Sequence, residues 1–186
     1  EYIVPGKASF EYLLSLGAAV EKIWIAPNAV DNDYFSQACD QHREAKDAFK
    51  KAKGYPEKII LYVGRLIDQK GILDLLRAFQ IISAPQPNLG LVFIGNGDGE
   101  ARYRDFCKTN NMGNIFFEGF AYQEELPAYY AIADVFVLPS HSEPWGLVLN
   151  EAMACKLPVI CSNATGAARD LIINGENGYI YEKGNV

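Results

Sequence analysis

Short apolar runs alternate along this chain with longer segments in which apolar residues recur at helical spacing. Ile59–Val63 and Leu91–Ile94 are unbroken runs of apolar and aromatic residues. Strands covered on both faces of a sheet have this composition, because neither set of alternating side chains faces water. Strands are therefore predicted at Lys22–Ala26, Lys58–Gly64, Leu89–Gly95, Asn114–Glu118, Asp134–Pro139, Pro158–Ser162 and Gly178–Tyr181.

Helices are predicted between these runs. Within Ile72–Ile82, residues Leu75, Leu76 and Phe79 recur at a spacing that places them on one helix face. The other predicted helices are Ala8–Leu16, Ser36–Lys53, Glu100–Asn110, Glu124–Ala133, Gly146–Cys155 and Ala167–Ile173. Strands and helices that alternate from Lys58 onward predict a doubly wound α/β fold, a parallel sheet with helices on both faces.

The length points to one domain and a remainder. A chain of 186 residues exceeds the roughly 150 residues of an average domain. The turn-rich segment Pro27–Asp31 separates the first predicted helix and strand from the rest. We therefore expect residues 1–35 to be the tail of a preceding domain with its hinge, and residues 36–186 to be the α/β domain. Since the chain begins at Glu1 and not at Met, we expect it to be a piece of a longer protein.

Charge and hydropathy exclude two classes of function. The 17 basic and 23 acidic residues give a net charge of −6, which argues against a nucleic-acid partner. No apolar run reaches the roughly 18 residues of a membrane span. Residues 43–58 carry a local positive excess, which fits a solvated helix face or a peripheral contact with a membrane surface.

The cysteine pattern argues against a metal site. Cys39, Cys107, Cys155 and Cys161 form no C-x-x-C pair, and the chain has only two histidines. We expect four isolated thiols and hence a reducing, cytoplasmic setting.

The loop after Lys58–Gly64 carries two cations. Arg65 offers a rigid fork of donors and Lys70 a mobile point charge, while Gly64 and Gly71 permit close backbone approach. Together they suit a diphosphate. The alternative is two solvated cations beside turn glycines.

The loop after Leu89–Gly95 is rich in glycine. It reads Gly95-Asn96-Gly97-Asp98-Gly99-Glu100, and the third glycine of a dinucleotide fingerprint is replaced by Glu100. This departure argues against hydride transfer. A tight loop near a ligand and a loop without a ligand both remain open.

The stretch after Asp134–Pro139 has the highest density of candidate chemistry. Glu143 precedes a predicted helix and Glu151 lies inside it, while the amides of Gly146 and Leu147 form an anion site at its start. Carboxylates accept hydrogen bonds from vicinal hydroxyls, so the combination describes a nucleotide-sugar. In the alternative, Glu143 caps the helix and Glu151 is merely exposed.

His141 lies beside this stretch. A lone histidine can serve as a general base. No carboxylate or nucleophile stands at a spacing that would orient it, so ordinary loop packing is the favoured interpretation.

As a set, these motifs resemble the retaining glycosyltransferases of group 1 (family 4, GT-B fold). The similarity rests on Gly64–Gly71, Gly95–Gly97, Pro139–Gly146 and the Glu143–Glu151 pair, which matches the E-x7-E motif of that family. Pro27–Asp31 is similar to the family's P-N-G-V-D, with Ala29 in place of Gly. The resemblance covers essentially the whole chain and implies the C-terminal, Rossmann-like donor-binding half of such an enzyme.

The resemblance implies catalytic roles for Arg65, Lys70 and Glu143. Arg65 and Lys70 would clamp the donor diphosphate and stabilise it as it leaves, without a metal or other cofactor. Glu143 would hold hydroxyls of the transferred sugar, and the configuration would be retained. The donor-binding set would be Gly64, Asn96, Gly97, Phe120 near the nucleobase, Gly146, Leu147, and Glu151 on the ribose.

One stretch departs from the family pattern. The family often reads G-G-x-x-E before its last helix, and here Ala167 takes the second glycine position while Asp170 stands in for the glutamate. The fine contacts of that loop are therefore open.

The implied function is hexosyl transfer from a nucleotide-diphosphate sugar to an unknown acceptor, with polysaccharide or glycolipid biosynthesis as the setting. The acceptor domain would precede Glu1 and a closing helix would follow Val186, so the isolated chain should bind donor and transfer poorly. The full-length protein would be cytoplasmic, with peripheral association at the inner face of the membrane as an open option. The alternatives are a non-catalytic nucleotide-sugar-binding module and a GT-B sugar-nucleotide epimerase.

Overall fold

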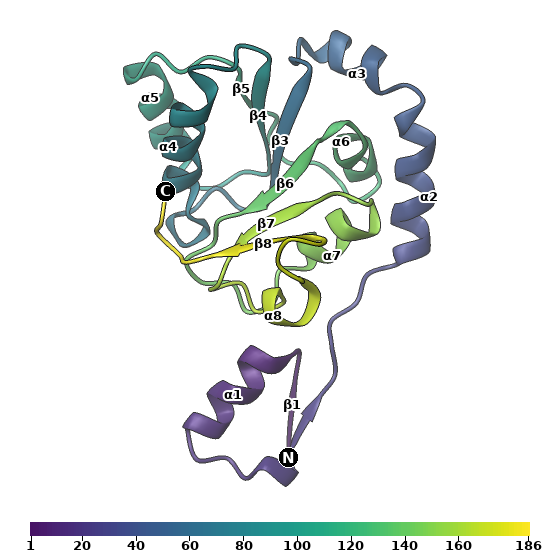
Figure 1. Ribbon diagram of the computed structural model, residues 1–186, viewed down its shortest axis with the longest axis vertical. Coiled ribbons are helices and arrows are strands. Elements are labelled where there is room, and N and C mark those ends of the chain that lie inside the picture. Colours follow the sequence, from purple (N-terminus) through teal and green to yellow (C-terminus); the bar gives the residue numbers. More distant parts are fainter.

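The apolar runs form a six-stranded sheet in a computed structural model that describes all 186 residues (Figure 1). The strand order is β5-β4-β3-β6-β7-β8 and every neighbouring pair is parallel. The doubly wound α/β prediction is confirmed. The strands are β3 (Lys58–Val63), β4 (Leu89–Ile94), β5 (Ile115–Phe117), β6 (Val135–Leu138), β7 (Val159–Ser162) and β8 (Gly178–Tyr181).

The strand order reverses direction between β3 and β6. The chain runs outward from β3 through β4 to β5, then returns to β6 and runs the other way to β8. Ile60 pairs with Val135 where these two halves meet. The loops that follow β3 and β6 diverge from this line, and in open parallel sheets such a switch point forms the ligand crevice.

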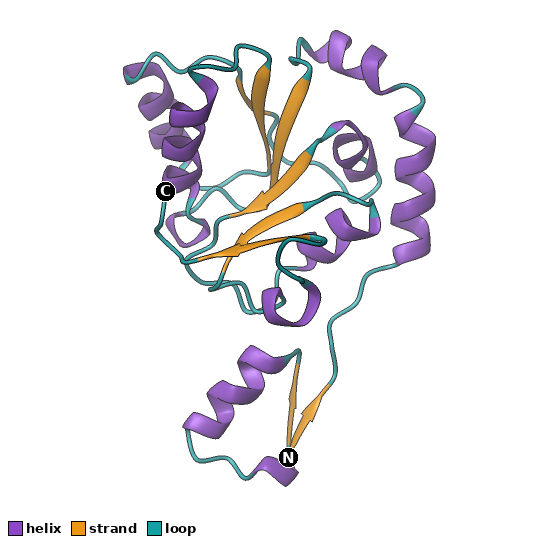
Figure 2. Cartoon of the chain, viewed as in Figure 1, coloured by secondary structure: helices purple, strands orange, loops and turns teal.

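Helices lie on both sides of the sheet, α4 and α5 on one and α6 and α7 on the other (Figure 2). A cluster of 36 buried residues fills the space between these layers. Each fully buried Leu, Ile or Phe in such a core contributes about 1.5–3 kcal/mol. The helices of this unit are α2 (Asn32–Arg43), α3 (Lys46–Lys53), α4 (Ile72–Ser83), α5 (Glu100–Thr109), α6 (Leu126–Ile132), α7 (Leu147–Ala154) and α8 (Ala168–Leu171), with a 3-10 turn η2 (Asp68–Lys70) before α4.

The single helix predicted over Ser36–Lys53 is two helices. Ala45, between α2 and α3, has non-helical backbone angles. Phe35 of α2 packs edge-on against Tyr130 of α6, whereas Phe49 of α3 packs against Tyr129. The two helices thus pack against α6 separately, each through its own aromatic contact.

The first 25 residues form a small separate unit below the sheet domain (Figure 1). It consists of β1 (Tyr2–Val4), α1 (Lys7–Ser15), a 3-10 turn η1 (Val20–Lys22) and β2 (Ile23–Ile25), and its two strands pair in parallel. Ile3 and Trp24 are 77% and 61% exposed. A two-stranded parallel sheet with exposed apolar side chains lacks the cover that parallel sheets normally have.

The expectation of four isolated thiols is wrong for one pair. Cys39 on α2 and Cys155 at the end of α7 form a disulfide with a Cα–Cα distance of 5.8 Å. The packing of α2 against α7 joins cysteines that are 116 positions apart, which no local sequence pattern reports. Cys107 and Cys161 are buried free thiols. None of the helices has the length and apolar character needed to cross a bilayer.

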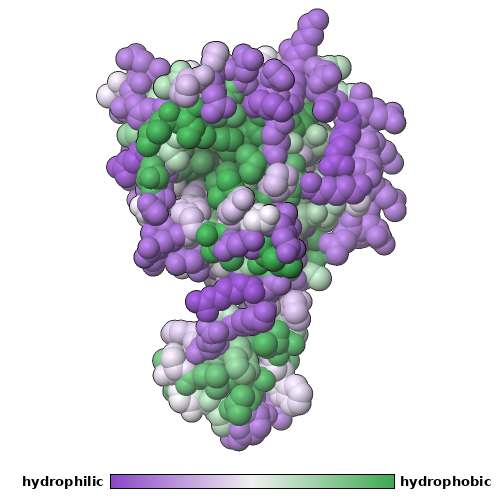
Figure 3. Space-filling view, in the orientation of Figure 1, coloured by the Kyte–Doolittle hydropathy of each residue, from purple (hydrophilic) through white to green (hydrophobic).

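Beside α4, the sheet carries an apolar groove of about 340 Å³. Figure 3 shows this region as a green hollow on the viewed face of the sheet domain. Its lining comes mainly from α4 and from strands β3, β6, β7 and β8, with the last two residues of the chain at one side, and includes Ile60, Phe79, Ile82, Val137, Ile160 and Tyr181.

Candidate functional site

The switch point between β3 and β6 holds a pocket of about 390 Å³. The loop after β3 forms one wall, and the loop after β6 with the start of α7 forms the other. Six of the residues selected from the sequence line it, namely Gly64, Arg65, Lys70, Glu143, Gly146 and Leu147. The structure thus brings together side chains that lie up to 82 positions apart, between Arg65 and Leu147.

An ion pair between Lys70 and Glu143 bridges the two walls. The Lys70 ammonium group donates to Oε2 of Glu143, and the two side chains are only 13% and 15% exposed. Partly buried charges interact more strongly than exposed ones because water screens them less. Any anion that enters the pocket therefore competes with Glu143 for Lys70.

Arg65 is the second cation of the pocket. Its side chain is exposed and makes no ion pair, so its guanidinium is free for a ligand. Its backbone carbonyl accepts a 2.9 Å hydrogen bond from the hydroxyl of Tyr62. Burial raises the pKa of that hydroxyl well above its usual value, so Tyr62 stays a donor and fixes the loop that carries Arg65.

The start of α7 supplies backbone donors. Gly146 lies before the first helical residue with φ of +95°, a conformation that glycine adopts without strain. No side chain caps the helix, so the alternative role of Glu143 as its cap is wrong. The amides of Gly146 and Leu147 make no backbone hydrogen bond and form the positive end of the helix dipole.

Glu151 lies one helical turn after Leu147 and on the same face of α7. It is half-buried, and its Oε2 accepts a 2.7 Å hydrogen bond from the hydroxyl of Tyr130 on α6. Burial raises the pKa of its carboxyl, and the hydrogen bond from Tyr130 opposes that shift. A merely exposed Glu151, the alternative from the sequence, is wrong.

Four selected residues lie outside the pocket lining, namely Glu151 on α7 and three on neighbouring loops. The loop with Asn96 and Gly97 lies against the loop after β3, since the Leu66 amide donates to the Asn96 carbonyl at 2.9 Å. A Cβ at Gly97 would collide with the Leu66 backbone, so the close packing of the two loops accounts for a glycine at this position. Phe120 is 63% exposed on the loop after β5, edge-on to Tyr122 with ring centroids 5.1 Å apart.

The pocket also has members that sequence reasoning missed. Asn28 reaches it from the linker, and Tyr62 and Trp145 line it from β3 and the loop after β6. The motif Pro27–Asp31 is the available signal for Asn28, whereas the only signal for Trp145 is its place within Pro139–Gly146.

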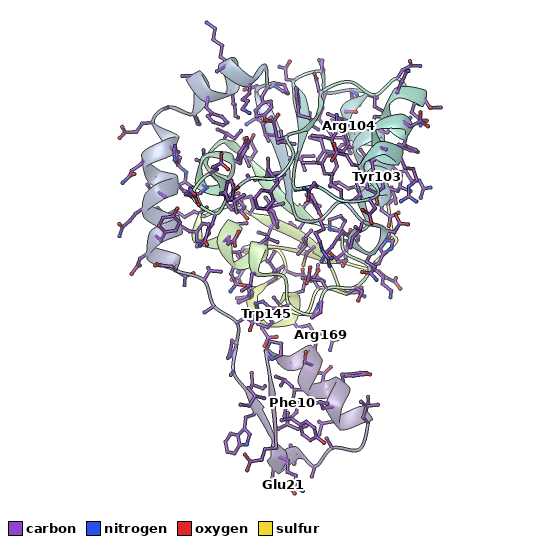
Figure 4. The ribbon with its side chains drawn as sticks, turned by 180° about the vertical axis from the view of Figure 1, so that it is seen from behind. Phe10, Glu21, Tyr103, Arg104, Trp145 and Arg169 are labelled. Carbon is purple, nitrogen blue, oxygen red and sulfur yellow. A yellow bond between two sulfur atoms is a disulfide. The ribbon has the colours of Figure 1, made fainter.

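Trp145 lies where the small N-terminal unit meets the sheet domain (Figure 4). It is buried, and a Cβ on Gly6 would contact its ring. The amide of Lys7 donates to the Asp170 carboxylate at 3.1 Å, and Arg169 forms an ion pair with Glu11. Asp170 therefore serves as the N-terminal cap of α1 from the other unit.

Comparison with known proteins gives one family. Residues 43–186 match the family model described as glycosyl transferases group 1. The capsular polysaccharide biosynthesis glycosyltransferase CapM of Staphylococcus aureus is 33% identical over 176 residues, which is 92% of this chain and 40% of that protein. The sulfoquinovosyl transferase SQD2 of Arabidopsis thaliana is 32% identical over 189 residues, 99% of this chain and 35% of that protein.

Solved structures share the fold. The C-terminal domain of the group 1 glycosyl transferase LpcC from Francisella tularensis is 28% identical with a TM-score of 0.68, and the match covers 84% of this chain and 81% of that one. Anabaena HepE, in a complex with UDP and glucose, is 23% identical with a TM-score of 0.79, and the match covers 98% of this chain and 49% of HepE. The chain spans about half the length of HepE and less than half the length of each of the two curated relatives.

Proposed function

Since this chain belongs to the group 1 glycosyl transferases, we propose that it is the half of such an enzyme that binds the nucleoside-diphosphate sugar donor. The observation that carries the proposal is the Lys70–Glu143 ion pair across a pocket that also holds Arg65 and the start of α7. UDP is the nucleotide we propose, because HepE was solved with it.

Arg65 and Lys70 bind the diphosphate. As the bond to the sugar breaks, negative charge grows on the leaving phosphate, and the two cations stabilise this charge more strongly in the transition state than in the ground state. The amides of Gly146 and Leu147 add donors at the helix start. Because Lys70 turns to the diphosphate, Glu143 is released to accept hydrogen bonds from the hydroxyls of the transferred hexose.

Glu151 binds the ribose hydroxyls. It shares a helix face with Leu147, which lines the pocket, and its second carboxylate oxygen remains available beside the Tyr130 contact. Phe120, Gly64, Asn96 and Gly97 complete the donor-binding set, with Phe120 offering an exposed aromatic face to the base. Sugar transfer proceeds with retention and uses no metal cofactor, since Arg65 and Lys70 supply the positive charge. A transfer assay in excess EDTA tests the latter point.

The rest of the active site comes from segments outside these 186 residues. A preceding acceptor domain, of which residues 1–35 are the tail and hinge, would cover the exposed Ile3 and Trp24 of the small unit. A closing helix would fill the apolar groove beside α4, since parallel sheets are covered on both faces. The isolated chain then binds donor and transfers sugar poorly.

We also propose a cytoplasmic site of action, with peripheral binding of the full-length protein to the inner face of the membrane. Support for the membrane contact is the positive excess of residues 43–58, which lies on the end of α2, on α3 and on the start of β3. Sedimentation with anionic vesicles of phosphatidylglycerol at low and high salt tests it, because an electrostatic contact weakens as salt rises.

Calorimetric titration of the chain with UDP-, GDP- and ADP-sugars tests the donor proposal. Binding of at least one of them is expected, with affinity lost in Lys70→Ala. No heat of binding with any of the three at millimolar concentration would refute it. Efficient sugar transfer by the isolated chain would instead refute the missing acceptor domain.

A further inference from the structure

His141 has the carboxylate partner that the sequence did not reveal. Its Nε2 lies 2.6 Å from Oδ2 of Asp74, in the first turn of α4. The Asp74 side chain is only 13% exposed, and its other charged contact is Arg77, 3.6 Å away. Asp74 is 67 positions before His141, so neither residue predicts the other from spacing.

The same two loops meet at three further points. The amides of His141 and Ser142 both donate to the carbonyl of Gln69, at 2.8 and 3.3 Å. Gly71, with φ of +65°, lies directly against the carbonyl of Pro139, where a Cβ would collide with that oxygen. The loop after β6 is thus held against the end of the loop after β3.

Lys70 stands between Gln69 and Gly71, and Glu143 follows Ser142. Each charged residue therefore sits next to a backbone contact that joins the two loops. Neither His141 nor Asp74 lines the pocket itself. Their hydrogen bond joins the loop after β6 to the first turn of α4, close in sequence to both Lys70 and Glu143.

We infer that His141 and Asp74 are positioning residues that hold Lys70 and Glu143 at the spacing needed to take up a nucleoside diphosphate. This inference rests on the proposed donor function. His141 acts through geometry: its imidazole is 44% exposed and fills no core space. Its removal loosens the loop and leaves no buried cavity, so the fold itself should survive.

Calorimetry with UDP on a small set of variants tests the positioning role of His141 and Asp74. His141→Ala should weaken UDP binding by about tenfold, as expected for one hydrogen bond to a charged group. His141→Gln keeps an N–H donor at about the reach of Nε2 and should stay within about threefold of wild type, which a side chain acting by bulk alone would not explain. His42→Ala, at an exposed histidine of α2, and Arg77→Ala, at the other partner of Asp74, should change affinity by less than about twofold.

Equal UDP affinity in His141→Ala and wild type would overturn the positioning role of His141, provided that Lys70→Ala still weakens UDP binding. If the wild-type chain does not bind UDP, the donor proposal fails. Amide hydrogen exchange then tests by itself whether His141 and Asp74 hold the loop after β6. In the ligand-free chain, His141→Ala should speed exchange at the Ser142 amide by about tenfold, while the amide of Phe136 in β6 stays protected. Unchanged exchange at Ser142 would show that the imidazole does not hold the loop.

Discussion

At the scale of single residues, the pocket is organised by competition for Lys70. In the ligand-free molecule its partner is Glu143, so the carboxylate that would bind the sugar also neutralises the cation that would bind the diphosphate. The sequence predicted both residues and their chemistry. It did not predict that they pair, because the contact depends on how the loops after β3 and β6 meet.

Lys70→Ala and Glu143→Gln should have different effects on the affinity for UDP without a sugar. The first removes a charged hydrogen bond and should weaken UDP binding by about 10- to 100-fold. The second removes the group that competes with the diphosphate for Lys70, so UDP should bind at least as tightly as it does to wild type. A UDP-hexose should lose the extra affinity over UDP that its sugar hydroxyls gain from Glu143. Calorimetry with both ligands measures this, with Lys51→Ala on the exposed face of α3 as the control. Weaker UDP binding in Glu143→Gln would contradict the competition.

Glu151 should lower the stability of the fold at pH 7 and strengthen the binding of UDP. Burial raises its folded-state pKa above the unfolded value, so its favourable contribution to stability is fully present below the unfolded pKa and is lost as pH rises through the folded pKa. Glu151→Gln stays neutral and should melt at a higher temperature than wild type at pH 7. The difference should shrink below about pH 4, and UDP affinity should fall by about tenfold. A variant that melts lower at pH 7 would show that the carboxylate stabilises the fold.

At the scale of elements, the hydrophobic pattern predicted the six strands of the main sheet and most helices. It missed β1, whose three residues are too few to show a pattern, and the break at Ala45 between α2 and α3. It also missed the Cys39–Cys155 pair and the cap that Asp170 supplies to α1. These features depend on contacts between distant segments, which periodicity does not encode.

Asp170→Ala should loosen the junction between the small unit and the sheet domain. Loss of a helix cap costs about 1 kcal/mol, so α1 should exchange its amides about fivefold faster while β6 is unaffected. Glu21→Gln is the matched control, because Glu21 is an exposed carboxylate of the small unit away from the contact with Asp170. Equal exchange of α1 in Asp170→Ala and wild type would remove Asp170 from the junction.

Reduction of the Cys39–Cys155 bond should destabilise the sheet domain. A link between α2 and α7 that spans 116 positions restrains the unfolded chain, and such bonds contribute about 2–4 kcal/mol to the free energy of unfolding. Denaturant unfolding with and without dithiothreitol measures the change, and the chain purified without reductant should show two free thiols. Four free thiols in the chain purified without reductant would contradict the Cys39–Cys155 bond.

At the scale of the whole molecule, the proposed donor pocket contrasts with two exposed apolar surfaces. The pocket draws its lining from the sheet domain and from the linker residue Asn28, whereas the apolar surfaces of the small unit and the groove beside α4 await cover. That contrast agrees with a chain that spans about half the length of HepE and less than half the length of CapM.

A crystal structure of the chain with UDP tests the central claim most directly. The account predicts the diphosphate between Arg65, Lys70 and the first amides of α7, with the Lys70–Glu143 ion pair broken. UDP bound elsewhere, or bound in the pocket with Lys70 still paired to Glu143, would contradict it.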